Sequence, residues 1–266
     1  MSVRLRHWAA LKTTDFAALD AERCVAVLPA GAVEQHGPHL PLGTDTYILE
    51  AVLARLPAML AEGADVVVLP MQQVGASIEH GDFPGTLSQR AEALIECWTA
   101  LGYAVADAGL RKLAILNSHG GQPQIADIVA QRLRAGRKML AVRINTFLLG
   151  VPDGLFAADE LKSGFHGGEI ETSMMLAIAP ELVGMRAAKN FENRARAHRG
   201  RTLQTEGGAA FSWQAQDLNK EGATGNAAAA DAKRGAALLD HIAARAAAAL
   251  ADMAAFPLSD LEDGPR

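Results

Sequence analysis

The stretch that decides the fold is residues 26–50, which reads AVLPAGAVEQHGPHLPLGTDTYILE. The apolar run 25–28 predicts a buried strand, and the apolar periodicity over 45–56 predicts a helix. Between and at the edge of these elements lie two imidazoles and two carboxylates, contributed by Glu34, His36, His39 and Asp45. The polar cluster therefore follows the carboxyl end of a strand, where open α/β sheets bind their ligands.

This cluster has the donor types of a metal site. Imidazole nitrogens mixed with carboxylate oxygens suit zinc, manganese and iron. Asp45 has a second interpretation, because an acidic residue at a helix start is often a cap, although one aspartate can also bridge two ions. His39 lies between prolines and is either a ligand or a group that faces the substrate. We predict a hydrolytic metal centre whose remaining ligands come from elsewhere in the chain.

The rest of the chain alternates short apolar strands with amphipathic helices. Strands are predicted at 65–70, 112–116 and 139–144, and helices at 88–108, 123–135, 169–178 and 226–255. This alternation predicts a three-layer α/β/α fold with a mostly parallel sheet. We expect one domain over 1–256, beginning with an entry segment, 1–22, and followed by a polar tail, 257–266. Residues 186–226 are polar and irregular, which indicates a surface excursion or an arm that meets another subunit.

Two further clusters are candidates for the same site. His119 follows the strand 112–116, so it lies at the sheet edge already assigned to the first cluster, and we expect it to be a ligand. His166, on a glycine-flanked turn, is a candidate proton shuttle because its reference pKa of about 6.5 suits acid–base work. Glu169 and Ser173 share one face of the following helix, whereas Glu171 is expected to point elsewhere. The residues predicted to contact substrate are His39, Ser77, Glu79, His80, Ser118, Gly120 and Gly121.

Bulk properties exclude several classes of protein. The formal net charge of −5 gives no indication of a nucleic-acid partner. No stretch approaches the roughly 20 apolar residues of a membrane span, and the amino terminus does not resemble a signal peptide, so a cytoplasmic protein is expected. Cys24 and Cys97 are predicted to be buried free thiols. The Arg-rich run 194–201 is either a solvated surface or an anion-binding segment. An oxidoreductase is disfavoured because no dinucleotide-binding glycine motif follows the first strand.

Together, four motifs resemble those of the creatininase family of metal-dependent amidohydrolases. They are GAVEQHGPHLPLGTD (31–45), EHGDFPGTL (79–87), NSHGGQ (117–122) and HGGEIETS (166–173). The resemblance implies an α/β/α domain with a divalent-metal centre, commonly binuclear, in a homo-oligomer that is often a hexamer. It also implies that Glu34, Asp45 and His119 bind one ion, and that His36 and a bridging Asp45 bind the other.

The sequence departs from creatininase itself at two places. Creatininase has a metal-binding glutamate where this chain has Gly121, and we expect Glu169 to substitute for it as ligand or base. Tryptophans that cover the creatininase substrate are replaced around 150–165 by Leu155, Phe156 and Phe165. The resemblance predicts a metal-dependent amidohydrolase with one or two ions per chain, zinc before manganese or iron, acting on a small linear or cyclic amide. The alternatives are deformylation of a pyrimidine nucleotide, peptide trimming in cofactor maturation, and a non-catalytic metal-binding protein.

Overall fold

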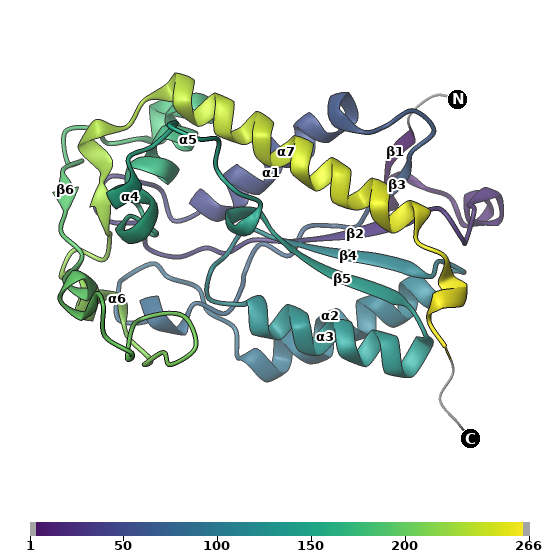
Figure 1. Ribbon diagram of the computed structural model, residues 1–266. Coiled ribbons are helices and arrows are strands. Elements are labelled where there is room, and N and C mark those ends of the chain that lie inside the picture. Colours follow the sequence, from purple (N-terminus) through teal and green to yellow (C-terminus); the bar gives the residue numbers. More distant parts are fainter. Residues whose placement is uncertain (1–3, 263–266) are drawn as a thin grey trace.

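The chain forms three layers, with helices on both faces of a central sheet (Figure 1). This computed structural model describes residues 4–262. Five strands, all parallel, lie in the order β1-β3-β2-β4-β5. Their bounds are β1 Arg4–His7, β2 Val25–Ala30, β3 Asp65–Val68, β4 Lys112–Asn117 and β5 Leu140–Asn145. The predicted three-layer, mostly parallel fold is confirmed.

The helices divide between the two faces of the sheet. Helices α1, α5 and α7 lie on one side of it in Figure 1, and α2 and α3 lie on the other. The helix bounds are α1 Thr44–Met59, α2 Ala91–Asp107, α3 Pro123–Arg137, α4 Ala158–Ser163, α5 Glu169–Ile178, α6 Ala215–Leu218 and α7 Ala232–Ala255. Trp98 and Leu133 bury the α2–α3 face, and Leu49 and Leu250 bury the α1–α7 face. None of the helices within residues 4–262 is long and apolar enough to cross a bilayer.

The strand order places a topological switch point between β2 and β4. The chain leaves β2 through α1 on one face of the sheet and leaves β4 through α3 on the opposite face. The loops after these two neighbouring strands therefore diverge, and α/β proteins commonly bind ligands at such a switch point. Ser118 joins the two loops, because its amide donates to Ala30 O (3.0 Å) and its hydroxyl to Asp45 O (2.9 Å).

Several local predictions were wrong or incomplete. Residues 4–7 are an edge strand, missed because charged and apolar side chains alternate there without an apolar run. Cys97 is exposed, whereas Cys24 is buried as predicted. The region 186–226 also contains a small antiparallel pair, β6 Asn190–Phe191 with β7 Gly225–Asn226.

Helix α7 starts later than the sequence indicated. It begins at Ala232, where the Asp231 side chain accepts a hydrogen bond from Arg234 N at 2.9 Å. The hydrogen bond of the Asp231 cap sets the start of the helix at Ala232. The helix propensity of the alanines before it does not extend the helix, so residues 226–231 lie outside α7.

Candidate metal centre

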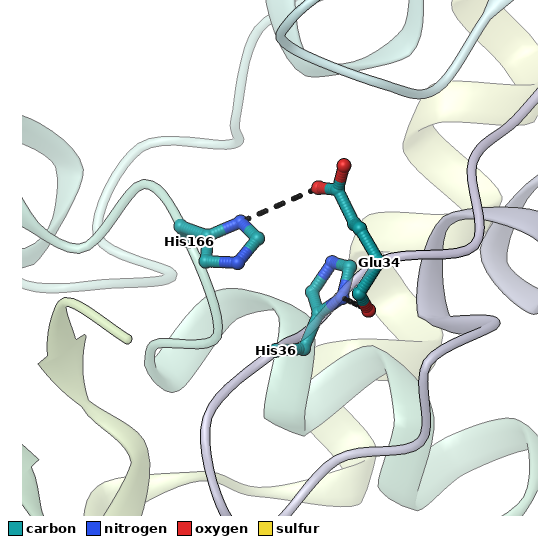
Figure 2. Close-up of side chains that lie close together, drawn as sticks. All are labelled: Glu34, His36 and His166. Atoms are coloured by element: carbon teal, nitrogen blue, oxygen red, sulfur yellow. Dashed lines mark hydrogen bonds and ion pairs between the residues drawn. The ribbon is translucent and has the colours of Figure 1, made fainter. Parts of the chain in front are cut away.

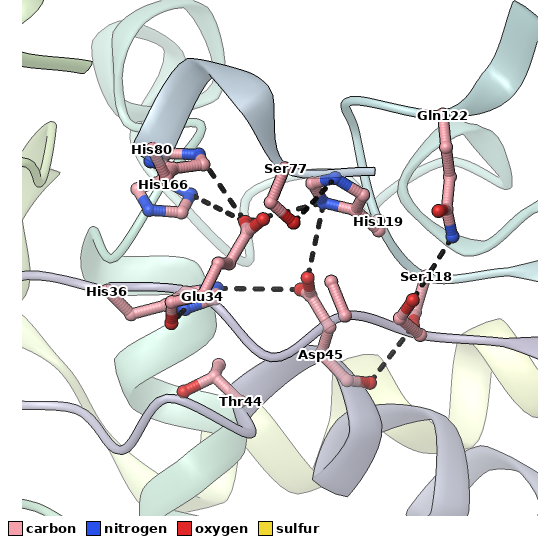
Figure 3. A network of polar contacts seen from close by, with 12 residues as sticks. Glu34, His36, Thr44, Asp45, Ser77, His80, Ser118, His119, Gln122 and His166 are labelled. Atoms are coloured by element: carbon pink, nitrogen blue, oxygen red, sulfur yellow. Dashed lines mark hydrogen bonds and ion pairs between the residues drawn. The ribbon is translucent and has the colours of Figure 1, made fainter. Parts of the chain in front are cut away.

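Three groups of side chains within residues 4–262 bring potential metal ligands together. The groups are Glu34–Asp45–His119, His36–Asp45–Glu171 and Glu34–His36–His166, and the ligand atoms of each group lie within 4.8 Å of one another. Asp45 belongs to the first two groups, which suits a carboxylate that bridges two ions. Figure 3 shows five of these side chains converging, from the β2–α1 loop, the first turn of α1, the β4–α3 loop and the turn before α5: Glu34, His36, Asp45, His119 and His166.

The first group combines one imidazole with two carboxylates. His119 Nδ1 lies 3.3 Å from Glu34 Oε1 and 3.3 Å from Asp45 Oδ2. On the other side of the ring, Nε2 donates to Ala76 O at 2.8 Å. Because a neutral imidazole carries one ring proton, this bond leaves the Nδ1 lone pair facing the carboxylates, as in metal-bound histidines.

In the second group, the His36 ring is held in the same way as the His119 ring, but the roles of its two nitrogens are exchanged. His36 Nδ1 donates to Glu34 O at 3.0 Å, which leaves Nε2 directed into the site. His36 Nε2 lies 3.5 Å from Asp45 Oδ1 and 3.9 Å from Glu171 Oε2. Each carboxylate is therefore within reach of an ion held by the His36 ring.

His166 enters the centre from the turn before α5. In Figure 2 its Nδ1 faces Glu34, at 3.8 Å from Oε1, and its ring stacks on His36 with a centroid distance of 4.3 Å. His166 Nε2 lies 2.7 Å from Gln35 O, to which it donates its ring proton. Burial, together with the neighbouring His36, lowers the pKa of His166 to about 3, so the ring is neutral at physiological pH.

The donor set fits a divalent cation. Glu34 Oε2, His36 Nε2 and Asp45 Oδ2 are buried and make no hydrogen bond within the described part of the chain. Burial disfavours a charged imidazole, but the Asp45 carboxylate and then Glu171 outweigh it and raise the pKa of His36 to about 10. Buried carboxylates without compensating charge are costly, and a cation between them supplies that charge. Nitrogen and oxygen donors of this kind suit zinc, manganese or iron.

The structure differs from the sequence analysis over the two glutamates of α5. Glu169 is paired with Arg234 of α7, and its backbone amide donates to Glu160 Oε1 at 2.8 Å. Glu171, which was expected to point away, instead approaches His36 and accepts a hydrogen bond from Gly167 N. Burial and the nearby Asp45 charge raise the pKa of Glu171 to about 7.

Glu79 occupies the space next to Gly121. A Cβ atom added at Gly121 would lie 1.9 Å from Glu79 Oε1 and 2.6 Å from His119 Nε2, whereas one added at Gly120 would meet nothing within 4 Å. Glu79 Oε1 is 3.7 Å from His119 Nε2, and the Glu79 side chain remains 13% exposed. The missing side chain at 121 thus leaves room for a carboxylate from another loop.

The other residues predicted to contact substrate have different surroundings. His80 Nε2 lies 3.4 Å from Glu34 Oε1, and Ser77 Oγ lies 3.5 Å from His119 Nε2. His39 turns away from the carboxylates, since Nε2 is 2.9 Å from Thr172 Oγ1 and the ring stacks on Phe191. Ser118 is buried and Gly120 is exposed.

Besides Glu171, sequence reasoning missed two further residues at or next to this site, Gln35 and Arg234. The Gln35 side chain is buried among His80, His166 and Gly222, and nothing in the sequence placed Gly222 near it. Arg234 is far from Glu169 in sequence and meets it only because α7 packs on α5. A signal existed for Gln35 alone, because it lies between two candidate ligands.

Comparisons with known proteins identify relatives of this chain. Among curated proteins, the chain is 37% identical over 160 residues to the mycofactocin precursor peptide peptidase of Mycolicibacterium smegmatis, covering 59% of each chain. It is 31% identical over 178 residues to the creatinine amidohydrolase of Pseudomonas putida, covering 61% of this chain and 67% of that one. The chain thus spans about three fifths of the length of the peptidases that it matches.

Solved structures show the same fold. A creatininase structure described as "Creatininase Mn" superposes with a TM-score of 0.71 at 23% identity, covering 95% of this chain and 98% of that one. A tryptophan-to-phenylalanine mutant of creatininase gives a TM-score of 0.75 at 24% identity, covering 92% and 98%. The family model described as "Creatininase: Creatinine amidohydrolase" matches residues 9–250, and the chain belongs to the creatininase family.

Proposed function

We propose that this protein is a metal-dependent hydrolase that cleaves a carbon–nitrogen amide bond. One divalent ion would be held by Glu34, Asp45 and His119, and a second by His36, Asp45 and Glu171. The observation that carries the proposal is the orientation of the rings. His36, His119 and His166 each give one N–H to a backbone carbonyl and turn the other nitrogen toward buried carboxylates.

The chemistry is divided between the ions and the chain's own side chains. Divalent ions in such a site polarise an amide carbonyl and lower the pKa of water toward neutrality. Glu34 and Asp45 are almost fully buried, whereas the Glu79 and Glu171 side chains are 13% and 20% exposed, so solvent reaches only the latter two of these four carboxylates.

Proton transfer is assigned to Glu79 rather than His166. The ring proton of His166 is already donated to Gln35 O, and the ring turns its free nitrogen toward Glu34. Glu79 is partly exposed, and burial, which outweighs the opposing effect of His119, raises the pKa of its carboxyl. A carboxyl with a raised pKa, such as that of Glu79, is suited to take a proton from water and pass it to the leaving nitrogen.

The substrate proposed first is a small linear or cyclic amide, with creatinine as the reference compound. A short peptide is the second candidate, favoured by the 37% identity to the mycofactocin precursor peptide peptidase. A phosphorylated nucleotide has less support, because Arg196 and Arg199 of the Arg-rich run are paired with Asp159 of α4.

A metal-reconstitution and substrate screen tests the proposal. Protein loaded with zinc, manganese or iron would be offered creatinine, formamides, small lactams and short peptides, with Asp45→Asn as the control. We expect turnover of one of these classes by the loaded protein and none by the variant. A protein that binds metal and remains inert toward all of them would be a non-catalytic metal-binding member of the family.

We also infer a cytoplasmic homo-oligomer, with a hexamer as the expected state. This inference rests on the resemblance to the creatininase family. Native mass spectrometry of the metal-loaded protein tests the assembly, and a monomer at physiological concentration would contradict it.

A further inference from the structure

A buried amide side chain, Gln35, lies between two candidate ligands and touches two histidines. Its Nε2 is 2.7 Å from His80 Nδ1 and 2.9 Å from Gly222 O, and its Oε1 accepts from Gly37 N at 2.9 Å. The two ends of an amide are hard to tell apart by shape, so their assignment has to come from the partners.

Two backbone partners fix the orientation of this amide. Gly222 O only accepts hydrogen bonds, so the NH₂ end of Gln35 must face it, and Gly37 N only donates, so the carbonyl end must face that group. The NH₂ group has two protons. One is donated to Gly222 O, and the other is directed at His80 Nδ1.

The tautomer of His80 follows from this count of protons. His80 Nδ1 accepts from Gln35, so the single proton of the neutral ring resides on Nε2. His80 Nε2 lies 3.4 Å from Glu34 Oε1, and the ring therefore presents an N–H to that carboxylate rather than a lone pair. Figure 3 shows His80 and His166 beside each other, both facing Glu34.

The backbone carbonyl of Gln35 fixes the orientation of the neighbouring His166 ring. Its Nε2 donates to Gln35 O, which leaves the Nδ1 lone pair toward Glu34. The 3.1 Å contact between His166 Nε2 and Gln35 Nε2 joins two donors, so it is a packing contact and not a hydrogen bond. The two rings stack at 4.2 Å and differ in what they offer Glu34.

We propose that Gln35 is a positioning residue that fixes the His80 tautomer, so that His80 donates a hydrogen bond to Glu34 and stays outside the set of metal ligands. The carbonyl oxygen of Gly222 holds the Gln35 amide in this orientation. It has φ +83°, and a Cβ there would lie 2.1 Å from Gln35 Oε1, so glycine is needed for both its backbone conformation and the close approach of the amide. The segment that carries Gly222 is thereby tied to the β2–α1 loop.

The test reads the tautomer directly by nitrogen-15 NMR of histidine-labelled protein, metal-free and zinc-loaded. The His80 signals are identified by their loss in His80→Asn. We expect His80 in the unsubstituted protein to carry its proton on Nε2. A proton on Nδ1, or a zinc-induced shift showing that His80 is itself a ligand, would overturn the proposal.

Substitution of Gln35 provides a second test of the proposal. In Gln35→Glu a carboxylate replaces the donor, so His80 should gain a proton on Nδ1, while the His119 ring stays unchanged. Gln35→Met removes all three hydrogen bonds of the side chain without adding charge and should weaken zinc binding by about tenfold or more, the range seen when ligand-supporting hydrogen bonds are lost. Gln73→Glu, at an exposed position, adds the same charge and should change neither the tautomer nor the affinity.

This inference concerns the site of the proposed function and builds on it, yet the two can fail separately. An inert protein with His80 protonated on Nε2 would contradict the hydrolase alone. A working hydrolase whose His80 Nδ1 stays unprotonated in Gln35→Glu would contradict the role of Gln35 alone. If Gln35→Glu does not fold, the spectrum of the unsubstituted protein still decides the tautomer.

Discussion

At the scale of single residues, the site depends on the lack of a side chain at Gly121 as well as on the side chains around it. Gly121 has no side chain, and the carboxylate of Glu79 lies where a Cβ would be. The adjacent Gly120 is surrounded by open space. Neither glycine has a positive φ, so any difference between them reflects packing and not backbone strain.

This contrast gives a matched pair of variants. We expect Gly121→Ala to displace Glu79 and tilt the His119 ring, at a cost of about 1–3 kcal/mol from overpacking. Metal affinity should fall by about tenfold or more because ring orientation is disturbed. Gly120→Ala should preserve both properties. Zinc titration measures the affinity, and urea unfolding measures the stability. Equal affinity and stability of the two variants would show that Glu79 does not need the space beside Gly121.

The two glutamates of α5 provide a second comparison at this scale. Glu171→Gln should bind less metal, because its carboxylate reaches His36 and the proposed second ion. Glu169→Gln should keep its metal and lose stability, because it removes the charge paired with Arg234. Elemental analysis after dialysis separates the two, and metal loss in Glu169→Gln alone would restore the original expectation for that residue.

At the scale of elements, the helices place the candidate ligands through a few specific contacts. Residues two apart on an α-helix point about 200° apart, so Glu169 and Glu171 cannot face the same neighbour. Gly235 lets α7 approach α5 so closely that a Cβ there would lie 1.9 Å from Ser173 O. The close packing of α7 fixes the rotation of α5, and that rotation decides which glutamate enters the centre.

The other end of α7 is held by a buried lysine. Lys112 Nζ donates to Ala254 O at 2.9 Å and Phe256 O at 2.7 Å, where the helix has unpaired carbonyls. Lys112→Met should destabilise the fold by about 1–3 kcal/mol, since these carbonyls lose a charged donor. Lys233→Met, at an exposed position of the same helix, is the control. Urea denaturation measures both, and an unchanged midpoint for Lys112→Met would show that water replaces the lysine.

At the scale of the whole molecule, the site is assembled from segments spread across most of the chain. The loops after β2 and β4 meet because those strands are neighbours in the sheet. The turn before α5 reaches the β2–α1 loop through the hydrogen bond from His166 Nε2 to Gln35 O at 2.7 Å. An ion shared by these segments would hold both faces of the fold together.

Removal of metal should therefore lower global stability. The free energy gained from a ligand that binds only the folded state is about 2.7 kcal/mol at 100 times its dissociation constant. Treatment with a chelator should lower the melting temperature, and added zinc or manganese should restore it in a concentration-dependent way. Asp45→Asn, which removes the shared ligand, should show a smaller response. A melting temperature insensitive to metal in the unsubstituted protein would argue against the centre.

The sequence by itself determined the three-layer fold and much of the centre. Apolar runs and helical periodicity marked β2 to β5, because burial on both faces leaves a strong local pattern, whereas β1 was missed as a short, half-exposed edge. The spacing of Glu34, His36 and Asp45 indicated candidate ligands within one short segment, where neighbours in sequence are neighbours in space. Only the tertiary structure decided between Glu169 and Glu171, placed Glu79 beside Gly121, and set the His80 tautomer through Gly222. These outcomes depend on helix rotation, free volume and distant hydrogen-bond partners, none of which is a local property of the chain.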